Sequence, residues 1–411
     1  MKKPELLAPA GDFEKLQFAI AYGADAVYLG AKRYSLRAMA KNFDEETLRK
    51  AVRYAHNAGC KVYAAANIFA RNDDLTSLPE YFSQISQAGV DACIVSDPGV
   101  FSILRDAAPE MNIHISTQAN NTNYMSAVFW QRLGAKRIVL ARELSFKEAS
   151  EIRDKAPGIE LEYFVHGAMC ISYSGRCLLS NFMAGRDSNR GACAHPCRYK
   201  YSLVEETRPG EYLPIEEDSR GSYIMNSKDL CLIGFIPQLI EAGISSFKIE
   251  GRMKSAYYVA ATVKAYREAI DDWFSNRSLY ESKKGHYLSE LKKAGNRGFC
   301  SGFFEGGPDS SSLEYNFDGG DAACDFLGTA LSYDEKSGLA VIEQRNKFSL
   351  GEDLEFFTPH GKGFTQNIKV MLDMDGFPIK DAPHPKQLVM VGASQPVAPF
   401  SILRRPKKID D

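Results

Sequence analysis

Short apolar runs alternate with amphipathic stretches over the first 165 residues of the chain. The runs are apolar at nearly consecutive positions and end in small or polar residues, which is typical of strands buried on both faces of a parallel sheet. The amphipathic stretches predict helices, one N-capped by Ser145 and another ended by Gly59. The predicted strands, including an eighth that follows a long interruption, cover residues 5–11, 25–30, 61–67, 91–97, 112–118, 136–142, 161–167 and 245–251.

Eight such strands with intervening helices predict an α/β fold, a (β/α)8 TIM-like barrel. A doubly wound open sheet is the main alternative. We favour the barrel because the units recur at even spacing and no G-x-G-x-x-G turn follows the first strand.

Two segments break the repeat. Residues 168–222 form a cysteine- and arginine-rich insertion between the seventh and eighth strands, and beyond about residue 295 strand-like runs are separated by glycine, aspartate and proline turns. We therefore expect a TIM-like barrel catalytic domain over residues 1–295 and a small C-terminal β-barrel domain over residues 320–405.

Four cysteines lie close together in the insertion, at Cys170, Cys177, Cys193 and Cys197. Their neighbours are Gly, Ser, Arg and Asn, which argues against simple core filling. The wide first spacing differs from the C-x-x-C knuckles of structural zinc sites. An all-cysteine set on a long irregular loop is typical of a [4Fe–4S] cluster, with zinc and structural cysteine as the alternatives. Cys231 is a fifth nearby thiol, although a buried helical position suits it better.

Composition narrows the class of protein. A net charge of −2 excludes a surface coated for general nucleic-acid binding, so any RNA contact must come from a local basic patch. No apolar run approaches the roughly 20 residues of a membrane span, and the apolar stretch after the first two lysines is too short for a signal peptide. Nine cysteines without an export signal indicate a reducing compartment, so we expect a cytoplasmic protein.

Catalytic groups of TIM barrels lie at the carboxyl ends of the strands. Polar side chains gather there, although each alone is equally consistent with a hydrogen-bonded loop residue. They are Asn67, Asp97, Thr117, Gln118, Arg142, Glu143, His166, Lys248, Glu250 and Arg252, with Arg37 and Lys228 in nearby loops.

A family resemblance is carried by the run EYFVHGAMCISYSGRCLLS at 162–180, which resembles the signature of the collagenase-like U-32 peptidase family. Other runs extend the resemblance over nearly the whole chain, the C-terminal β region included. They are PELLAPAGDFEKLQFAIAYGADAVYLGAKRYSLRA, SDPGV, STQANNTN, LARELS, MNSKDL and SSFKIEGRMKS. Within the family the chain is most similar to the branch that hydroxylates tRNA.

The resemblance implies an oxygen-independent tRNA hydroxylase that forms 5-hydroxyuridine at the anticodon wobble position. It also implies a [4Fe–4S] cluster on Cys170, Cys177, Cys193 and Cys197, and prephenate as the source of the hydroxyl group. A related branch that hydroxylates ubiquinone takes a later cysteine as its fourth ligand, so Cys197 and Cys231 both stay open for that position.

Other activities of the same family are the alternatives: hydroxylation of rRNA or ubiquinone, or a collagenase-like peptidase. The chain has no H-E-x-x-H motif and no G-x-S-x-G motif. A dyad of Cys170 and His166 can be drawn, but a thiolate bound to iron is not free to act as a nucleophile.

Under the implied reaction, guanidinium groups would bind a dicarboxylate bidentately, with Lys248 as a point charge. Amides would bind a uracil edge, and His166 would be a general acid or base. The expected catalytic residues are His166, Gln118, Arg142, Lys248, Glu250 and Arg252. The expected substrate-binding residues are Arg37, Asn67, Thr117, Lys228, Arg186 and Arg190.

An RNA substrate also needs phosphate contacts, and the candidates in the insertion are Arg186, Arg190, Arg198 and Lys200. The rings available nearby for base stacking are Tyr173, Tyr199 and Tyr201. The basic tail offers Arg404, Arg405, Lys407 and Lys408, although such charge runs are more often solvated surface. We expect tRNA and a prephenate-like molecule as partners, no membrane, and no obligate protein partner.

Overall fold

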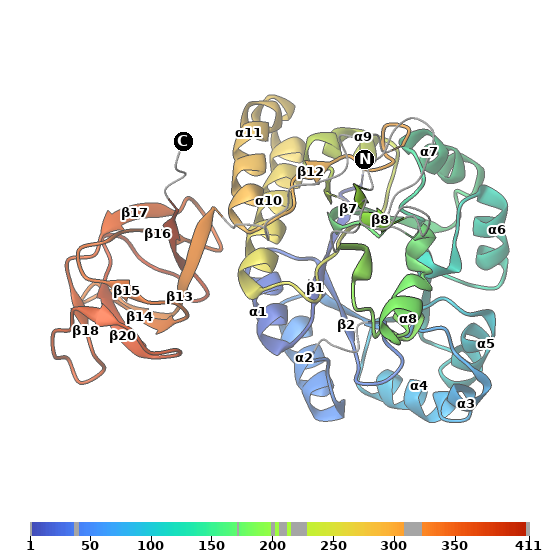
Figure 1. Ribbon diagram of the computed structural model, residues 1–411, viewed down its shortest axis with the longest axis horizontal. Helices are drawn as coiled ribbons and strands as arrows, with labels where there is room; N and C mark the ends of the chain where they lie inside the picture. Colours follow the sequence, from blue (N-terminus) through green and yellow to red (C-terminus); the bar gives the residue numbers. More distant parts are fainter. Residues whose placement is uncertain are drawn as a thin grey trace.

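A parallel barrel forms the larger part of the protein (Figure 1). The computed structural model describes residues 2–36, 41–170, 172–198, 202–204, 212–214, 228–307 and 323–407. Strand β11 pairs in parallel with both β1 and β7, which closes the ring. Because the ring is closed, the fold is the predicted barrel and not the open sheet. All eight predicted strands are confirmed. In ring order they are β1 (Glu5–Ala10), β2 (Ala26–Gly30), β3 (Lys61–Ala65), β4 (Ala92–Val95), β5 (Asn112–Ile115), β6 (Arg137–Val139), β7 (Glu160–Ala168) and β11 (Ser246–Ile249).

Helices surround the barrel and cover its apolar strands. Ser145 caps its helix as predicted, because its side chain accepts from the Glu148 amide while Glu148 reaches back to the cap amide. Gly59 follows the second long helix with a φ of 71°, a conformation that suits glycine. The helices are α1 (Phe13–Ala21), α2 (Glu45–Asn57), α3 (Asn72–Leu75), α4 (Leu78–Gln87), α5 (Pro98–Ala107), α6 (Tyr124–Arg132), α7 (Phe146–Lys155), α9 (Ile236–Glu241), α10 (Ala256–Ser275) and α11 (Arg277–Lys293). None of the helices in the described ranges is both long enough and apolar enough to cross a bilayer.

The described residues of the insertion after β7 form short turns, a hairpin and one short helix, α8 (Leu179–Ala184). Figure 1 shows α8 drawn across the open end of the barrel. The turns are η2 (Tyr173–Gly175), η3 (Ser188–Arg190) and η4 (Pro196–Arg198), and a hairpin of β8 (Ser202–Val204) and β9 (Tyr212–Pro214) follows. The chain returns to the barrel through β10 (Asp229–Cys231), which is antiparallel to β7 and pairs with β12 (Phe299–Cys300). Cys231 therefore ends a strand, and the expected helical position is wrong.

The C-terminal part is all β, as predicted, with its own apolar core. Its main antiparallel sheet has β17 and β18 at its edges. In sheet order the strands are β17 (Phe364–Asn367), β16 (Asp353–Phe357), β21 (Ile402–Pro406), β13 (Cys324–Asp334), β14 (Leu339–Gln344), β20 (Leu388–Gly392) and β18 (Met371–Leu372), and a separate pair joins β15 (Phe348–Ser349) to β19 (Asp381–Ala382).

Candidate active site at the barrel mouth

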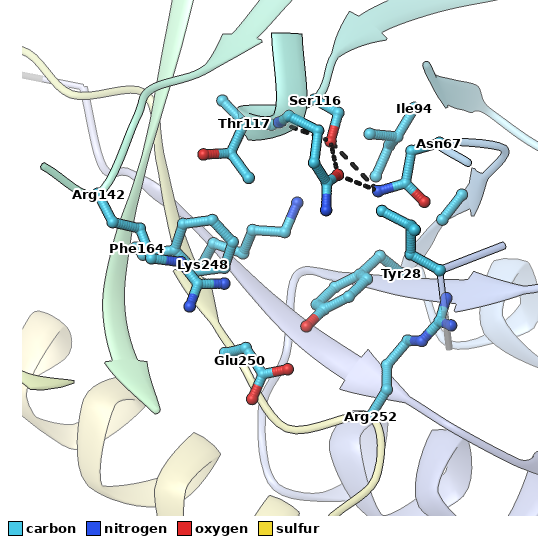
Figure 2. Close-up of a pocket in the computed structure, with 14 residues that line it drawn as sticks. Tyr28, Asn67, Ile94, Ser116, Thr117, Arg142, Phe164, Lys248, Glu250 and Arg252 are labelled. Carbon is cyan, nitrogen blue, oxygen red and sulfur yellow. Dashed lines mark hydrogen bonds between the residues drawn. The ribbon is translucent and has the colours of Figure 1, made fainter. Parts of the chain in front are cut away.

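A cavity of about 70 Å³ opens at the carboxyl ends of the barrel strands. Figure 2 shows the labelled side chains arranged around this space. Seven of the polar rim residues predicted from the sequence meet here, although they come from distant parts of the chain. The lining residues are Tyr28, Leu36, Ala65, Asn67, Ile94, Ser116, Thr117, Gln118, Val139, Arg142, Phe164, Lys248, Glu250 and Arg252.

One wall of the cavity is a network of amides and a hydroxyl. Asn67 Nδ2 donates to Gln118 Oε1 at 2.7 Å, and Ser116 Oγ donates to the same oxygen at 2.8 Å. These bonds orient both amides, because they use the oxygen of Gln118 and the nitrogen of Asn67. Asn67 Oδ1 is buried and accepts no hydrogen bond from the described residues. The wall therefore offers the acceptor Asn67 Oδ1 beside the donor amide of Gln118.

Cations occupy the opposite side of the cavity. The guanidinium of Arg142 stacks 3.9 Å from the centroid of the Phe164 ring, and its Nη1 donates to Ala168 O at 2.6 Å. Lys248 Nζ lies 4.6 Å from the centroid of the Tyr28 ring. Arg252 is buried, and its Nη2 donates to Ser35 Oγ at 2.7 Å. These contacts hold three positive charges around one small space.

A buried charge network lies beneath these cations and was missed by the sequence reasoning. Lys248 Nζ is 2.6 Å from Glu162 Oε1, and Arg137 Nη1 is 3.1 Å from Glu162 Oε2 and 2.6 Å from Glu5 Oε1. Burial raises the pKa of Glu162, but the two cations outweigh this effect and hold the pKa below its usual value. Burial lowers the pKa of Lys248, and the attraction of Glu162 opposes that shift. The sequence did contain a signal for this network, because Glu162, Arg137 and Lys248 are charged residues inside otherwise apolar strands.

His166 does not line the cavity. A β-bulge in β7 after Phe164 shifts the register against β11, and the ring of His166 packs against Tyr258, Tyr266 and Phe299. Burial lowers the pKa of His166 to about 4. The structure therefore separates His166 from the other candidates, and the expected general acid or base at the cavity is not brought into place. The alternative dyad with Cys170 is likewise not supported.

Lys228 also falls elsewhere. Lys228 packs beside Gly298 and lines neither this cavity nor the one beside it. Arg37 lies outside the described residues.

A second cavity of about 100 Å³ adjoins the first. The two share four lining residues, Leu36, Thr117, Gln118 and Arg142. The second cavity is lined by all four cysteines of the insertion. Its remaining lining residues are Glu143, Ala168, Met169, Ser174, Gly175, Leu179, Ser188, His195 and Pro196. Cys231 does not line it and instead accepts a hydrogen bond from the Tyr266 hydroxyl at 3.9 Å. This placement favours Cys197 over Cys231 as the fourth thiol of the set.

The donor chemistry of the second cavity suits a thiolate-bound metal centre. All nine cysteines are free, and the carboxylate of Glu143 is already engaged, because the Ser174 amide donates to it at 2.5 Å. The donors that this wall offers are therefore soft sulfurs, together with the imidazole of His195 beside Cys193. No three candidate ligands in the described segments stand close enough together to hold a metal ion, so the thiols share a wall without forming a coordination sphere. Metal binding at these thiols would release protons, because the thiolate is the ligand.

The arginines of the insertion mostly hold it against the barrel. Both terminal nitrogens of Arg190 bond to Asp74, at 2.8 and 3.0 Å, so the expected phosphate contact by Arg190 is not supported. Arg176 donates to Gln118 O at 2.9 and 2.7 Å. Arg186 donates through Nε to Ala192 O at 2.9 Å and remains exposed.

The basic tail is engaged within the protein. Arg404 is fully buried, 2.7 Å from Glu290 and 2.6 Å from Glu355. Arg405 pairs with Asp325 and Glu352. Arg404 is therefore not the solvated surface residue that the charge run suggested, nor is it exposed to contact RNA, and Lys408 lies outside the described residues.

Comparisons with known proteins agree with this architecture. The profile of Peptidase family U32 matches residues 11–314, and that of the Peptidase family U32 C-terminal domain matches residues 322–404. The tRNA hydroxylation protein P1 of Bacillus subtilis (strain 168) is 42% identical over 99% of this chain and 96% of the relative. The tRNA hydroxylation protein P of Escherichia coli (strain K12) is 40% identical over 88% of this chain and 87% of the relative. A collagenase of Porphyromonas gingivalis is 31% identical over 86% of each.

Proposed function

The chain belongs to peptidase family U32, and from that premise we propose that it is a tRNA-modifying enzyme that hydroxylates uridine at C5, at the anticodon wobble position. The names of two full-length relatives at 40% identity or more support tRNA hydroxylation. The observation that carries the proposal is the polar cavity at the barrel mouth beside a wall of four thiols.

The amide wall matches the edge of a uracil ring. Uracil presents a ring N–H donor between two carbonyl acceptors. Asn67 Oδ1 supplies an acceptor, and the amide nitrogen of Gln118 supplies a donor, because its oxygen already accepts two hydrogen bonds. A buried acceptor without a partner costs about 1–3 kcal/mol, which the ring N–H of uracil would recover.

The cations suit a second, acidic substrate. Arg142, Lys248 and Arg252 surround the same space and would bind a dicarboxylate such as prephenate. Replacing C5–H of uridine by C5–OH oxidises the ring by two electrons. Without molecular oxygen the balance closes if the acid donates the hydroxyl group, so that uridine gains C–OH and the donor exchanges its C–OH for C–H.

Cys170, Cys177, Cys193 and Cys197 would hold the iron–sulfur cluster in this proposal. Such a cluster, when bound, supplies one-electron transfer or an iron that polarises a bound oxygen. Arg142 lines both cavities, so its guanidinium can hold a carboxylate at the boundary between them.

Nucleoside mass spectrometry tests the proposal. A strain that lacks the gene should lose 5-hydroxyuridine derivatives from its tRNA, and the wild-type gene should restore them. Arg142→Ala should fail to restore them while keeping the iron content of the protein. Arg132→Ala changes an exposed arginine of α6 and should restore them fully. Unchanged tRNA in the deletion strain, with loss of an rRNA or quinone modification, would show a different substrate.

Purified protein tests the chemistry directly. In the absence of oxygen, cluster-loaded protein should hydroxylate unmodified tRNA only when prephenate is added. Product formed equally well without prephenate would remove the acid from the proposal. Release of peptides from collagen by the same preparation would instead support the peptidase alternative.

A further inference from the structure

Among the described residues of the insertion, the most exposed apolar side chains lie on and beside α8. Phe182 is 83% exposed, Leu178 61% and Tyr173 52%, and Met183 is exposed as well. These four residues are called the α8 surface below. Large apolar side chains that gather at a surface usually mark an interaction site.

The α8 surface lies at the entrance to the candidate active site. Leu179, in the first turn of α8, lines the cysteine cavity, and Phe182 follows one turn later. Figure 1 shows the helix across the open end of the barrel. The helix is held in place, because Ser180 is fully buried and its Oγ accepts from the Ala194 amide at 2.9 Å. The ring of Phe182 is therefore presented outward from a fixed support.

The segment that carries this apolar surface is rich in arginine. Residues 170–198 contain four arginines and one aspartate, whereas the whole chain has a net charge of −2. Arg190 is neutralised by Asp74, but Arg186 forms no ion pair with any acid among the described residues. Exposed aromatic rings with nearby guanidinium groups bind single-stranded nucleic acid, because bases stack on the rings while phosphates meet the cations.

We propose that the α8 surface binds the unpaired bases of an RNA loop next to the uridine in the barrel mouth, with Phe182 as the stacking ring and Arg186 on an adjacent phosphate. The inference rests on the proposed function and deepens it. In this arrangement the cavity binds the uridine. The α8 surface selects uridines in single-stranded loops, because only unpaired neighbouring bases can stack on Phe182.

Binding of an anticodon stem-loop to the cluster-loaded full-length protein tests the role of Phe182. Phe182→Ala should weaken binding about tenfold, as expected for the loss of one base–aromatic stack. Phe182→Tyr should retain binding, and Phe182→Leu should resemble Ala, because Leu keeps apolar area without a ring face. Phe129→Ala is the matched control, since Phe129 is also exposed (54%) but lies on α6. A duplex RNA of equal length should bind all these variants equally.

The salt dependence of binding tests Arg186. Arg186→Ala should reduce the slope of log K against log salt by about 1, because one phosphate contact is lost. Arg132→Ala should leave the slope unchanged. Iron content and melting temperature should match wild type in the variants of Phe182, Phe129 and Arg132, since each of these side chains is exposed. Arg186 also bonds to Ala192 O, so Arg186→Ala is compared with wild type at equal iron content.

Three results would overturn the inference. Wild-type affinity of Phe182→Ala in a protein that still hydroxylates tRNA would refute the α8 surface alone and leave the proposed function standing. Tight RNA binding by Phe182→Leu, with a dimer that Phe182→Ala dissociates in light scattering, would show that a second copy covers this surface. A wild-type protein that neither binds nor modifies the stem-loop would refute the inference together with the proposed function.

Discussion

The position of Lys248 in the cavity is fixed by its ion pair with the buried carboxylate of Glu162. Glu162 is fully buried and lies between Lys248 and Arg137, so the charge at the barrel mouth is fixed from the opposite end of the barrel. Ionised groups this deep in a protein persist only when their partners are in place.

Glu162→Gln should therefore destabilise the barrel by about 3 kcal/mol, the typical cost of leaving a buried charge without its partner. It should also lower the pKa of Lys248, because the attraction that opposes burial is lost. Lys248 would then lose its proton at lower pH, so the alkaline limit of hydroxylation should move to lower pH. The matched control is Glu160→Gln, which removes a partly exposed partner of Arg137 and should cost less than about 1 kcal/mol. An unchanged pH profile in Glu162→Gln would contradict a positioning role.

A different prediction follows from His166 and concerns how the stability of the fold depends on pH. Its pKa is about 4 in the folded protein against an ordinary value of 6.5. The unfolded chain binds the proton more readily between these values, so stability should be complete above pH 6.5 and should fall by about 3 kcal/mol as the pH falls to 4. The two tryptophans, Trp130 and Trp273, both lie in barrel helices and report unfolding of this domain in urea.

His166→Gln should make the urea midpoint less dependent on pH over this interval, whatever its stability at pH 7. Part of the dependence should remain, because His114 is also buried with a pKa well below its ordinary value. Equal slopes in the variant and the wild type would show that His166 does not titrate in this way.

At the scale of elements, the insertion is tethered to the barrel by a few polar contacts. The pair of Asp74 in α3 and Arg190 in η3 is bidentate, and the Ser174 amide donates to Glu143 on the opposite side. These tethers carry the loop that bears the four cysteines. The position of the thiols therefore depends on barrel residues far away in the sequence.

Asp74→Ala should accelerate loss of the proposed cluster about tenfold when the protein is incubated with an iron chelator. Arg190→Ala should have the same effect, and the double variant should be no worse than either single variant, since one interaction is removed in all three. Asp73→Ala is the control, because this neighbouring carboxylate is exposed. Additive effects of the two substitutions would mean that the residues act separately. The decay of cluster absorbance measures each rate.

The sequence predicted the elements better than the side-chain directions. Strand positions follow from consecutive apolar residues, and the N-cap at Ser145 follows from the Ser–Glu spacing, because both depend on local interactions. His166 was placed at the rim by counting along β7, but a one-residue bulge changed where its ring packs. Arg190 looked available for phosphate because its partner Asp74 is 116 residues away. Bulges and long-range ion pairs leave little local signal, so such roles need the structure.

At the scale of the whole molecule, the C-terminal domain contacts the side of the barrel and does not reach the barrel mouth. Neither cavity at the mouth is lined by a residue of 323–407, and Figure 1 shows this domain beside α10 and α11. The interface is built around Arg404, which bonds to Glu290 of α11, to Glu355 of its own sheet and to the Tyr257 hydroxyl of α10 at 3.1 Å. Tyr22, which follows α1 directly, donates hydrogen bonds to Phe357 O and Phe400 O at 2.9 and 3.0 Å.

Arg404→Ala should uncouple the two domains. It removes one of the two cations that hold Glu290 and Glu355, because Lys293 stays 2.6 Å from Glu290 and 3.7 Å from Glu355. The cost at the interface should therefore lie below the about 3–5 kcal/mol of a fully unpaired buried charge, while the cavities at the barrel mouth keep their lining residues. Calorimetry should therefore show two separate transitions in the variant where the wild type shows one, and stem-loop binding should persist at temperatures below the first transition. Arg405→Ala is the matched control, because its pairs with Asp325 and Glu352 are partly exposed and lie within the C-terminal domain. A single transition at the wild-type temperature would show that Arg404 does not couple the domains, and binding lost at every temperature would show that the C-terminal domain takes part in RNA recognition directly.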